Sequence, residues 1–398
     1  MSKLDENVSR SSYVLVIDAL DECDNDKHIL TIIDLLTEAR SLKMVRLRVF
    51  LTSRGEVAIR KRFTRMSETE YQDFALHNIS SPIVDHDISK FLGCSLKLIA
   101  QEKSLDIGWP GKEVIRQLIQ NAGGLFIWAA TACRFVEEGL FADERVQSLL
   151  EGSTFADAPE EHPEAHLNKL YTTVLKKSLR PGYSGKEKNA LCSILRHILG
   201  SLVVLLSPLS ATSLRKLLNV TKEKIEVLKD LHAILDIPKV DVYPLRFHHP
   251  SFRDFLLDST RCKDQNFCVS ERQAHQVLAD NCIRLMSASL KQYICGVDAP
   301  GTLVSDVERS RVEQSLSAEV QYACRYWIEH IRRSGTQLCD DSQVHVFLRE
   351  HLLHWLEALG WMGKMPEGVH AIASLESFSS VSIHLEQYRI SLRSWLVK

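Results

Sequence analysis

Residues Tyr13 to Cys23 read YVLVIDALDEC, and this stretch decides the fold of the N-terminal part of the chain. Five apolar residues in a row, mostly β-branched or aromatic, predict a buried parallel strand. Three carboxylates follow it directly, at the end of a strand where open α/β sheets bind ligands. Mg²⁺ prefers such oxygen ligands, so Asp18 is a candidate metal ligand. Asp21 and Glu22, one turn further on, are candidates to orient or deprotonate an attacking water.

A helix and a second strand follow. Apolar residues recur at helical spacing from about His28 to Leu42, which predicts an amphipathic helix. The short run Leu47–Leu51 predicts another strand, and it ends in Thr-Ser-Arg with Arg54 last. Strand, helix and strand form a βαβ unit with a right-handed crossover. We therefore expect Asp18 and Arg54 at neighbouring strand tips, facing one ligand.

This order of motifs resembles the NACHT branch of the STAND signal-transducing NTPases, and most of all the fungal NACHT proteins that carry WD repeats. The resemblance implies a P-loop NTPase core that binds ATP or ADP with Mg²⁺. It makes Asp18 the Mg²⁺ ligand of a Walker B segment, Asp21 or Glu22 the catalytic acid that activates water, and Arg54 the sensor-1 arginine. The competing structural interpretation is a helix N-cap followed by first-turn carboxylates, which the helix dipole favours.

The phosphate-binding loop of this family, G-x-x-x-x-G-K-[ST], does not occur in the sequence. The nearest stretches begin at Gly108 and Gly182, and both have the wrong spacing and a Glu in place of the Mg²⁺-binding hydroxyl. We therefore expect a fragment of the family architecture in which nucleotide binding is weak or absent. Whether the chain is an enzyme stays open at this stage.

The fold class expected is α/β followed by mostly α. Residues 1–95 are predicted to be the C-terminal part of the nucleotide-binding core, a partial parallel sheet. Residues 96–155 are expected to form a small helical domain, and residues 164–262, three helices followed by a hairpin, a winged-helix domain. Residues 266–398 are predicted to be a helical extension. They contain no repeat of about forty residues and no Trp-Asp dipeptides, so no repeat domain is expected.

A second motif lies in the predicted winged helix, where Phe247 to Leu256 read FHHPSFRDFL. The resembling family carries H-x-S-F-x-[DE]-F-L here, and His249 fits its histidine, which is expected to reach the β-phosphate of ADP. An imidazole can donate to a phosphate oxygen and gain charge beside it. The alternative is that Ser251 caps the next helix, with buried phenylalanines and both histidines solvated.

Composition excludes several function classes. The formal net charge of −2 gives no basic field for nucleic acid or an anionic membrane. The N-terminus lacks the apolar segment of a signal peptide, the longest apolar run is too short for a bilayer, and the 10 cysteines form no C-x-x-C pair. A cytoplasmic location is expected, with protein partners, among them further copies of the chain or full-length relatives.

Two functions from different classes follow. The first is a truncated STAND/NACHT signalling regulator, derived from nucleotide-dependent switches. The second is a non-catalytic helical adaptor that binds protein partners, because the C-terminal half is long and helical.

Overall fold

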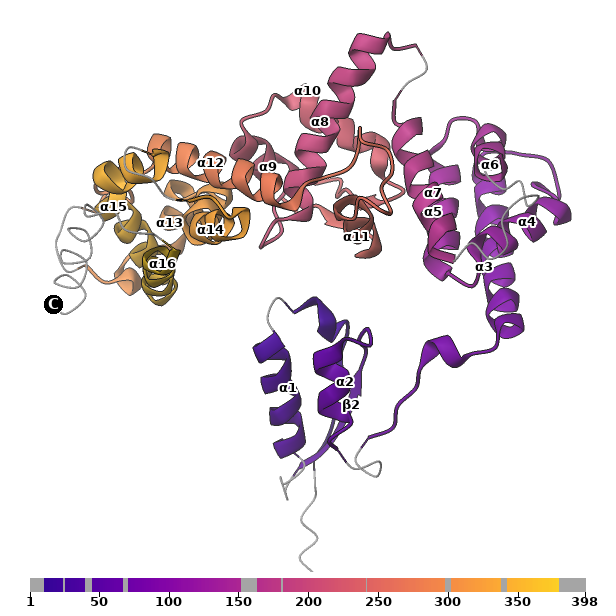
Figure 1. Cartoon of the computed structure of the whole chain (residues 1–398), viewed down its shortest axis with the longest axis horizontal. Coiled ribbons are helices and arrows are strands. Elements are labelled where there is room, and N and C mark those ends of the chain that lie inside the picture. Colours follow the sequence, from indigo (N-terminus) through magenta and orange to yellow (C-terminus); the bar gives the residue numbers. More distant parts are fainter. Residues whose placement is uncertain are drawn as a thin grey trace, which may run out of the picture. The chain divides into compact units, whose positions relative to one another are not determined.

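The computed structural model describes residues 11–23, 26–39, 45–66, 71–151, 163–179, 182–240, 242–297, 302–337 and 342–378. The chain divides into two compact units, Met1–Ser80 and Ser81–Lys398. Figure 1 shows the elements of both units. The boundary predicted at residue 95 falls inside a continuous helix that begins at Ser81, so the domain assignments stay predictions.

The first unit contains the predicted βαβ unit. Strand β1 (Ser11–Ile17) pairs in parallel with β2 (Val45–Leu51), and α1 (Asp26–Glu38) connects them. Two short helices and a further turn complete the unit: η1 (Leu20–Glu22), α2 (Val57–Phe63) and η3 (Leu76–Asn78). Both predicted strands and the predicted helix are therefore present, within a few residues of the expected ends.

The expectation that the first strand is buried is wrong. Val14 and Val16 are 69% and 62% exposed, and Phe50 beside them on β2 is 61% exposed. The small core of this unit lies instead at the C-terminal ends of the strands, where α1 and α2 pack together (Figure 1). These two helices meet the sheet through Ile17 and Leu51, so they cover only part of one sheet face.

Where the structure describes it, the second unit is helical apart from one short antiparallel pair of strands and a single bridge between Ser210 and Pro244. Its first half comprises α3 (Ser81–Glu102), α4 (Lys112–Ala122), α5 (Phe126–Glu138), α6 (Ala142–Leu150), α7 (Pro163–Lys177), α8 (Gly185–Val203), α9 (Ala211–Leu218), α10 (Lys222–Glu226) and η4 (Val227–Leu231). Its second half comprises β3 (Leu235–Asp236), β4 (Arg246–Phe247), α11 (Ser251–Leu257), α12 (Glu271–Ser289), η5 (Val304–Asp306), α13 (Arg309–Ser315), α14 (Ala318–Ser334), α15 (Gln343–Trp361) and α16 (Met365–Phe378).

Local chemistry sets many helix ends. Ser184 and Glu187 form a capping box at the start of α8, and Ser210 caps α9. Gly123 takes the left-handed conformation that ends α4, as the Gly-Gly pair there predicts. The chain after α9 forms α10 and, directly after it, η4, and Leu235 then pairs with Phe247 of β4.

Polar contacts tie the predicted winged-helix segment to the C-terminal helices. Lys216 of α9 lies 2.8 Å from the buried carboxylate of Glu319 on α14. Arg284 of α12 donates to the carbonyl of Leu217, at the C-terminal end of α9, over 2.8 Å. Carbonyls at a helix end lack intrahelical partners, so this guanidinium satisfies one of them. Segments far apart in the sequence are thereby held in one core.

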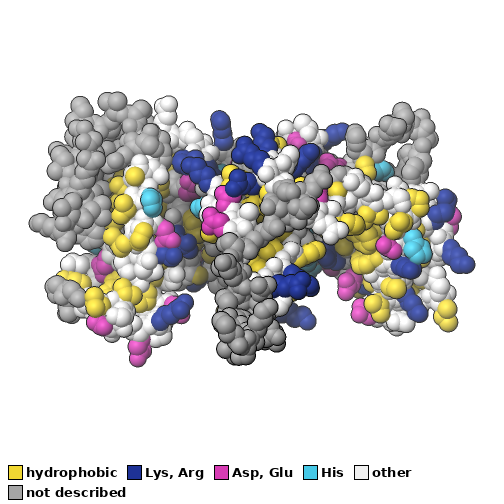
Figure 2. Space-filling model, turned by 90° about the horizontal axis from the view of Figure 1, so that it is seen from below, with side chains coloured by type: hydrophobic (Ala, Val, Ile, Leu, Met, Phe, Trp, Pro, Cys, Tyr) yellow, Lys and Arg dark blue, Asp and Glu magenta, His cyan; other side chains and the backbone are white. Residues whose placement is uncertain are grey.

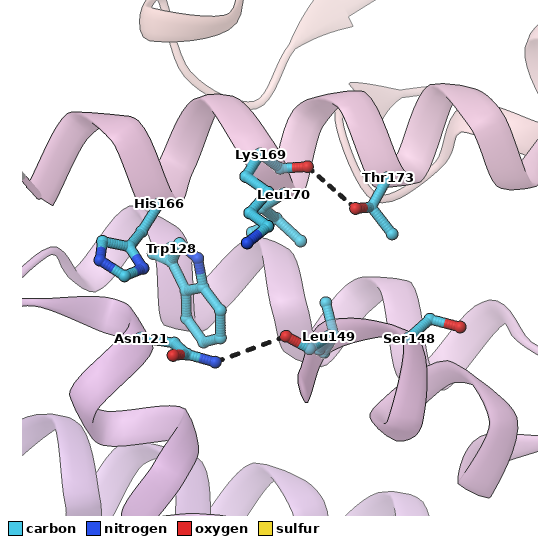
Figure 3. Close-up of a pocket in the computed structure, with 8 residues that line it drawn as sticks. All are labelled: Asn121, Trp128, Ser148, Leu149, His166, Lys169, Leu170 and Thr173. Atoms are coloured by element: carbon cyan, nitrogen blue, oxygen red, sulfur yellow. Dashed lines mark hydrogen bonds between the residues drawn. The ribbon is translucent and has the colours of Figure 1, made fainter. Parts of the chain in front are cut away.

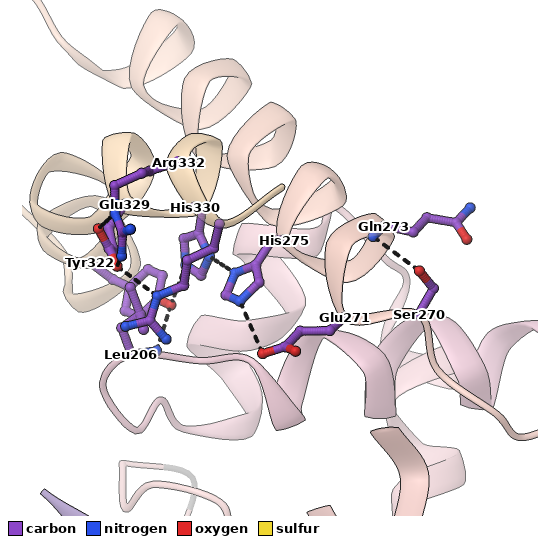
Figure 4. Close-up of polar contacts among 10 residues, drawn as sticks. Leu206, Ser270, Glu271, Gln273, His275, Tyr322, Glu329, His330 and Arg332 are labelled. Atoms are coloured by element: carbon purple, nitrogen blue, oxygen red, sulfur yellow. Dashed lines mark hydrogen bonds and ion pairs between the residues drawn. The ribbon is translucent and has the colours of Figure 1, made fainter. Parts of the chain in front are cut away.

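A buried hydrogen-bond relay joins the segment that follows α8 to α12 and α14 (Figure 4). The N–H of Leu206 donates to the hydroxyl of Tyr322, which leaves the hydroxyl proton for Nε2 of His330. His330 then carries its proton on Nδ1 and donates to Nδ1 of His275 over 2.8 Å. The N–H at Nε2 of His275 points toward Glu271, whose carboxylate lies 3.9 Å away.

Both histidines are fully buried, and burial lowers the pKa of His275 to about 4 and that of His330 to about 3. The unfolded chain keeps ordinary histidine pKa values, so it binds more protons than the folded chain between about pH 6.5 and pH 4. The stability that depends on these neutral rings is therefore complete above this window and is lost as the pH falls through it.

We predict that the free energy of unfolding of the second unit falls by roughly 3 kcal/mol per histidine from pH 7 to pH 4. Urea denaturation followed by tryptophan fluorescence measures it, because Trp327 and Trp355 lie together in the core beside the relay. His275→Gln should flatten the pH dependence. His86→Gln, an exposed change on α3, should leave it unchanged. Equal slopes in all three proteins would contradict the prediction.

Among the described residues, no helix combines the length and apolar character that crossing a membrane requires.

Candidate functional site

The candidate site lies where β1 and β2 end. Ile17 and Leu51 are the last paired residues, and beyond them the two chains stay hydrogen-bonded. The N–H of Thr52 donates to the carbonyl of Ile17 over 2.9 Å, and the N–H of Leu20 donates to the carbonyl of Thr52 over 3.0 Å. Ala19 takes a left-handed conformation, with φ of 52°, and turns the chain onto the tip of β2.

Asp18 is held by the neighbouring strand tip. The hydroxyl of Thr52 donates to Oδ1 of Asp18 and accepts the N–H of Ala19 over 2.8 Å. The carboxylate of Asp18 is otherwise exposed at the sheet edge. The competing interpretation holds in part: Asp21 and Glu22 lie in the first turn of η1, but Ala19 occupies its N-cap and no side chain caps it.

Asp21 and Arg54 form a second contact between the two tips. The backbone N–H of Arg54 donates to Oδ1 of Asp21 over 2.9 Å, and Nε of Arg54 lies 3.5 Å from Oδ2. The side chain of Asp21 is only 9% exposed, whereas that of Arg54 is 44% exposed. Asp21 is therefore engaged in fixing Arg54, while Glu22 is exposed.

The structure thus brings together four of the five predicted site residues: Asp18, Asp21, Glu22 and Arg54. No group of three or more His, Cys, Asp or Glu side chains suited to a metal ion occurs among the residues that the structure describes. A single exposed carboxylate still fits Mg²⁺, which commonly keeps several waters and takes its other ligands from nucleotide phosphates. The roles of these four residues in binding and catalysis stay predictions.

His249, the fifth predicted residue, lies in the second unit, just before α11. Its Nδ1 accepts the backbone N–H of Ser251 over 3.2 Å and lies 2.7 Å from the hydroxyl of Ser251. That hydroxyl lies 2.7 Å from the hydroxyl of Tyr171 on α7. Because Nδ1 accepts a backbone N–H, the proton of the neutral imidazole is on Nε2.

The neighbouring His248 bonds to backbone carbonyls instead. Its Nε2 donates to the carbonyl of His232, at 2.9 Å, and its backbone N–H donates to the carbonyl of Ile234. Burial, with Arg134 nearby, lowers the pKa of His248, so the ring stays a neutral donor. The alternative in which Ser251 caps α11 is wrong, because Pro250 occupies the N-cap position. Neither histidine is fully solvated, although Phe252 is buried as that alternative required.

Sequence reasoning missed two residues of these sites. Thr52 belongs to the Thr-Ser-Arg motif, and its position directly after the predicted strand could have indicated a place beside Asp18. Tyr171 lies 80 residues from Ser251 in the sequence, and no local pattern marks it.

The cavities of the second unit do not form a site of comparable definition. One, of about 20 Å³, lies between helices α4 to α7 (Figure 3) and has room for a single water. The buried Asn121 beside it donates to the carbonyl of Leu149, while its Oδ1 has no hydrogen-bond partner among the described residues. A larger hollow of about 410 Å³ is lined by both charge signs: Glu138, Arg145, Lys177, Ser178, Lys229, Asp230 and His232.

Comparisons with known proteins bear on the strand-tip site and on the chain as a whole. A family model described as nephrocystin 3, N-terminal, matches residues 1–54, which include β1, η1, α1 and β2. The chain is also similar to the vegetative incompatibility protein HET-E-1 of Podospora anserina, with 27% identity over 389 residues. The predicted resemblance to fungal NACHT-type proteins is thereby confirmed.

The match with HET-E-1 covers 91% of this chain but only 26% of that protein, so the chain spans about a quarter of its relative's length. No solved structure matches the chain significantly.

We predict that Asp21→Ala lowers the free energy of unfolding of the first unit by about 0.5–1.5 kcal/mol, because it removes the acceptor of the Arg54 backbone N–H and the carboxylate beside its guanidinium. Glu22→Ala, an exposed change one residue away, should alter it by less than about 0.5 kcal/mol. Hydrogen exchange measured by mass spectrometry on the peptides of β1 and β2 distinguishes the two. Equal protection in both variants would show that Asp21 does not hold the strand tips.

Proposed function

We propose that the first unit is the metal-coordinating and phosphate-sensing part of a nucleotide-dependent signalling switch. One observation carries this proposal: a carboxylate at the C-terminal edge of two parallel strands is held by a hydroxyl from the neighbouring strand tip. This is the edge at which open α/β sheets bind their ligands. The relationship to fungal NACHT-type proteins supports the same assignment.

In this proposal each charged residue has its own task. Asp18 coordinates the Mg²⁺ of a bound nucleotide, and Arg54 senses the γ-phosphate. Glu22 orients or deprotonates the attacking water, and the geometry favours it over Asp21, which is held against Arg54. Mg²⁺, when bound, would neutralise charge on the phosphate oxygens.

The second unit would supply the control of the switch. We assign residues 96–155 to a small helical domain, 164–262 to a winged helix and 266–398 to a helical extension. The Nε2–H of His249 would donate to a nucleotide phosphate, and its tautomer, set by Ser251, suits that task. The contacts from α9 to α12 and α14 would carry a change at this histidine to the C-terminal helices.

The biological setting that we propose for the switch comes from the similarity to HET-E-1. HET-E-1 is named a vegetative incompatibility protein, and we place this chain in fungal recognition of the same kind, in the cytoplasm, with protein partners that include further copies of the chain.

Manganese tests the metal site, because Mn²⁺ replaces Mg²⁺ and broadens nearby NMR signals. Titration of the full ¹⁵N-labelled chain with Mn-ATP should broaden the amide signals of Asp18, Ala19 and Arg54 first, in the millimolar range. Asp18→Asn should raise the concentration for half-broadening by at least about 10-fold, since the metal loses its anionic ligand.

Asp73→Asn is the matched control, because it removes an exposed carboxylate from the same unit outside the site. Its titration should equal that of the wild-type chain. Broadening that is uniform over the chain, or that Asp18→Asn leaves unchanged, would overturn the proposal.

The adaptor function is the alternative, and exposed apolar side chains favour it. Ile107, Leu140 and Phe141 are exposed on two loops, and a hydrogen bond of 2.6 Å joins Trp109, in the first loop, to Asp143, in the first turn of α6 after the second loop. Hydrophobic side chains also lie among both charge signs on the face that Figure 2 shows. Such groups can mark a protein contact.

If the adaptor binds a second copy through these loops, sedimentation should show concentration-dependent association that the double change Leu140→Ser and Phe141→Ser abolishes. Association that persists in the double variant, or a wild-type chain that stays monomeric, would reject self-association through these loops.

A further inference from the structure

Thr52 is the most heavily engaged residue of the strand-tip site. Its backbone N–H and carbonyl bond to Ile17 and Leu20, on either side of Asp18 and Ala19. Its hydroxyl bonds to the two residues between them. One residue at the end of β2 therefore contacts four consecutive residues that leave β1, so the position of Thr52 relative to this corner is fixed.

The direction of the hydroxyl bonds follows from the donors. Ala19 can only donate its N–H, so the hydroxyl oxygen of Thr52 accepts it over 2.8 Å. The single hydroxyl proton is then directed to Oδ1 of Asp18. A hydroxyl donating to a carboxylate makes a charge-assisted hydrogen bond, which is stronger than one between neutral groups.

We infer that Thr52 is a positioning residue for the metal ligand: its hydroxyl holds Oδ1 of Asp18 and so presents Oδ2 to the cation. The inference rests on the proposed function, because it needs Asp18 to be the Mg²⁺ ligand. Partners of this kind fix the orientation of ligating carboxylates, and their loss typically lowers metal affinity by about 10- to 100-fold.

The left-handed turn at Ala19 belongs to the same arrangement. An alanine with φ of 52° is uncommon, and here the turn directs its N–H to the Thr52 hydroxyl. A purely structural role of Thr52 would need only these bonds to hold the corner together. A positioning role requires in addition that metal affinity follows the hydroxyl, which separates the two roles experimentally.

The experiment measures Mn-ATP broadening of the Asp18 and Ala19 amides in the full chain for a set of variants. Thr52→Ala removes the hydroxyl and should raise the half-broadening concentration by about 10- to 100-fold. Thr52→Ser restores a hydroxyl and should return the value to within about threefold of wild type. Thr31→Ala, which removes an exposed hydroxyl bonded within α1, should have no effect.

Each outcome has a separate meaning. A wild-type response in Thr52→Ala, with a native amide spectrum, overturns the positioning role and leaves the metal site standing. No local broadening in the wild-type chain overturns the proposed function and this inference with it. Should Thr52→Ala lose the native spectrum of the first unit, Thr52→Cys replaces it, because a thiol is only a weak donor. The half-broadening concentration should rise in this variant too, and a wild-type response would overturn the positioning role.

Discussion

The parallel pairing of β1 with β2 places every charged group of the candidate site. Seven residues of each strand are in register, and the two chains leave the sheet at the same edge. Because the pairing continues beyond the strands through the backbone of Thr52, the turn at Ala19 and the first residues of η1 are fixed against the tip of β2. The hydroxyl of Thr52 then orients the carboxylate of Asp18, and the backbone N–H of Arg54 orients that of Asp21.

Much of this arrangement could be predicted from the sequence, because its signals are local. The apolar runs of β1 and β2 and the helical period of α1 each lie within a few residues, and their order indicates a parallel pair. The partners of Asp18 and Asp21 could not be predicted in the same way. They depend on the left-handed turn at Ala19, and alanine carries no sequence signal for that conformation. The burial of β1 was predicted wrongly, because an apolar run does not show how much of the sheet the helices cover.

The second unit shows the same division between local and distant information. The sequence predicts a small helical domain, three helices with a hairpin and a helical extension, but it does not mark the short helices α2, α6, α13 and α16 individually. The environment of His249 was hidden for a different reason. The hydroxyl of Tyr171 belongs to another helix, so the motif around His249 indicates a histidine but not what orients it. The buried pair His275 and His330 has no motif at all, and only packing of α12 on α14 brings the rings together.

The relay through these two rings has a consequence for how the unit holds its shape. Each group donates to the next, starting from the peptide N–H of Leu206 and ending at His275, whose Nε2 lies 3.9 Å from the carboxylate of Glu271, one turn earlier on α12. The tautomer of His275 therefore follows from the bond that Leu206, in the segment just beyond α8, makes to Tyr322. If that segment withdrew, Tyr322 would be free to reverse its hydroxyl, and the imidazoles could exchange tautomers in turn. The relay thus connects the segment that follows α8 to two C-terminal helices through buried polar groups whose donors and acceptors are all set from one end.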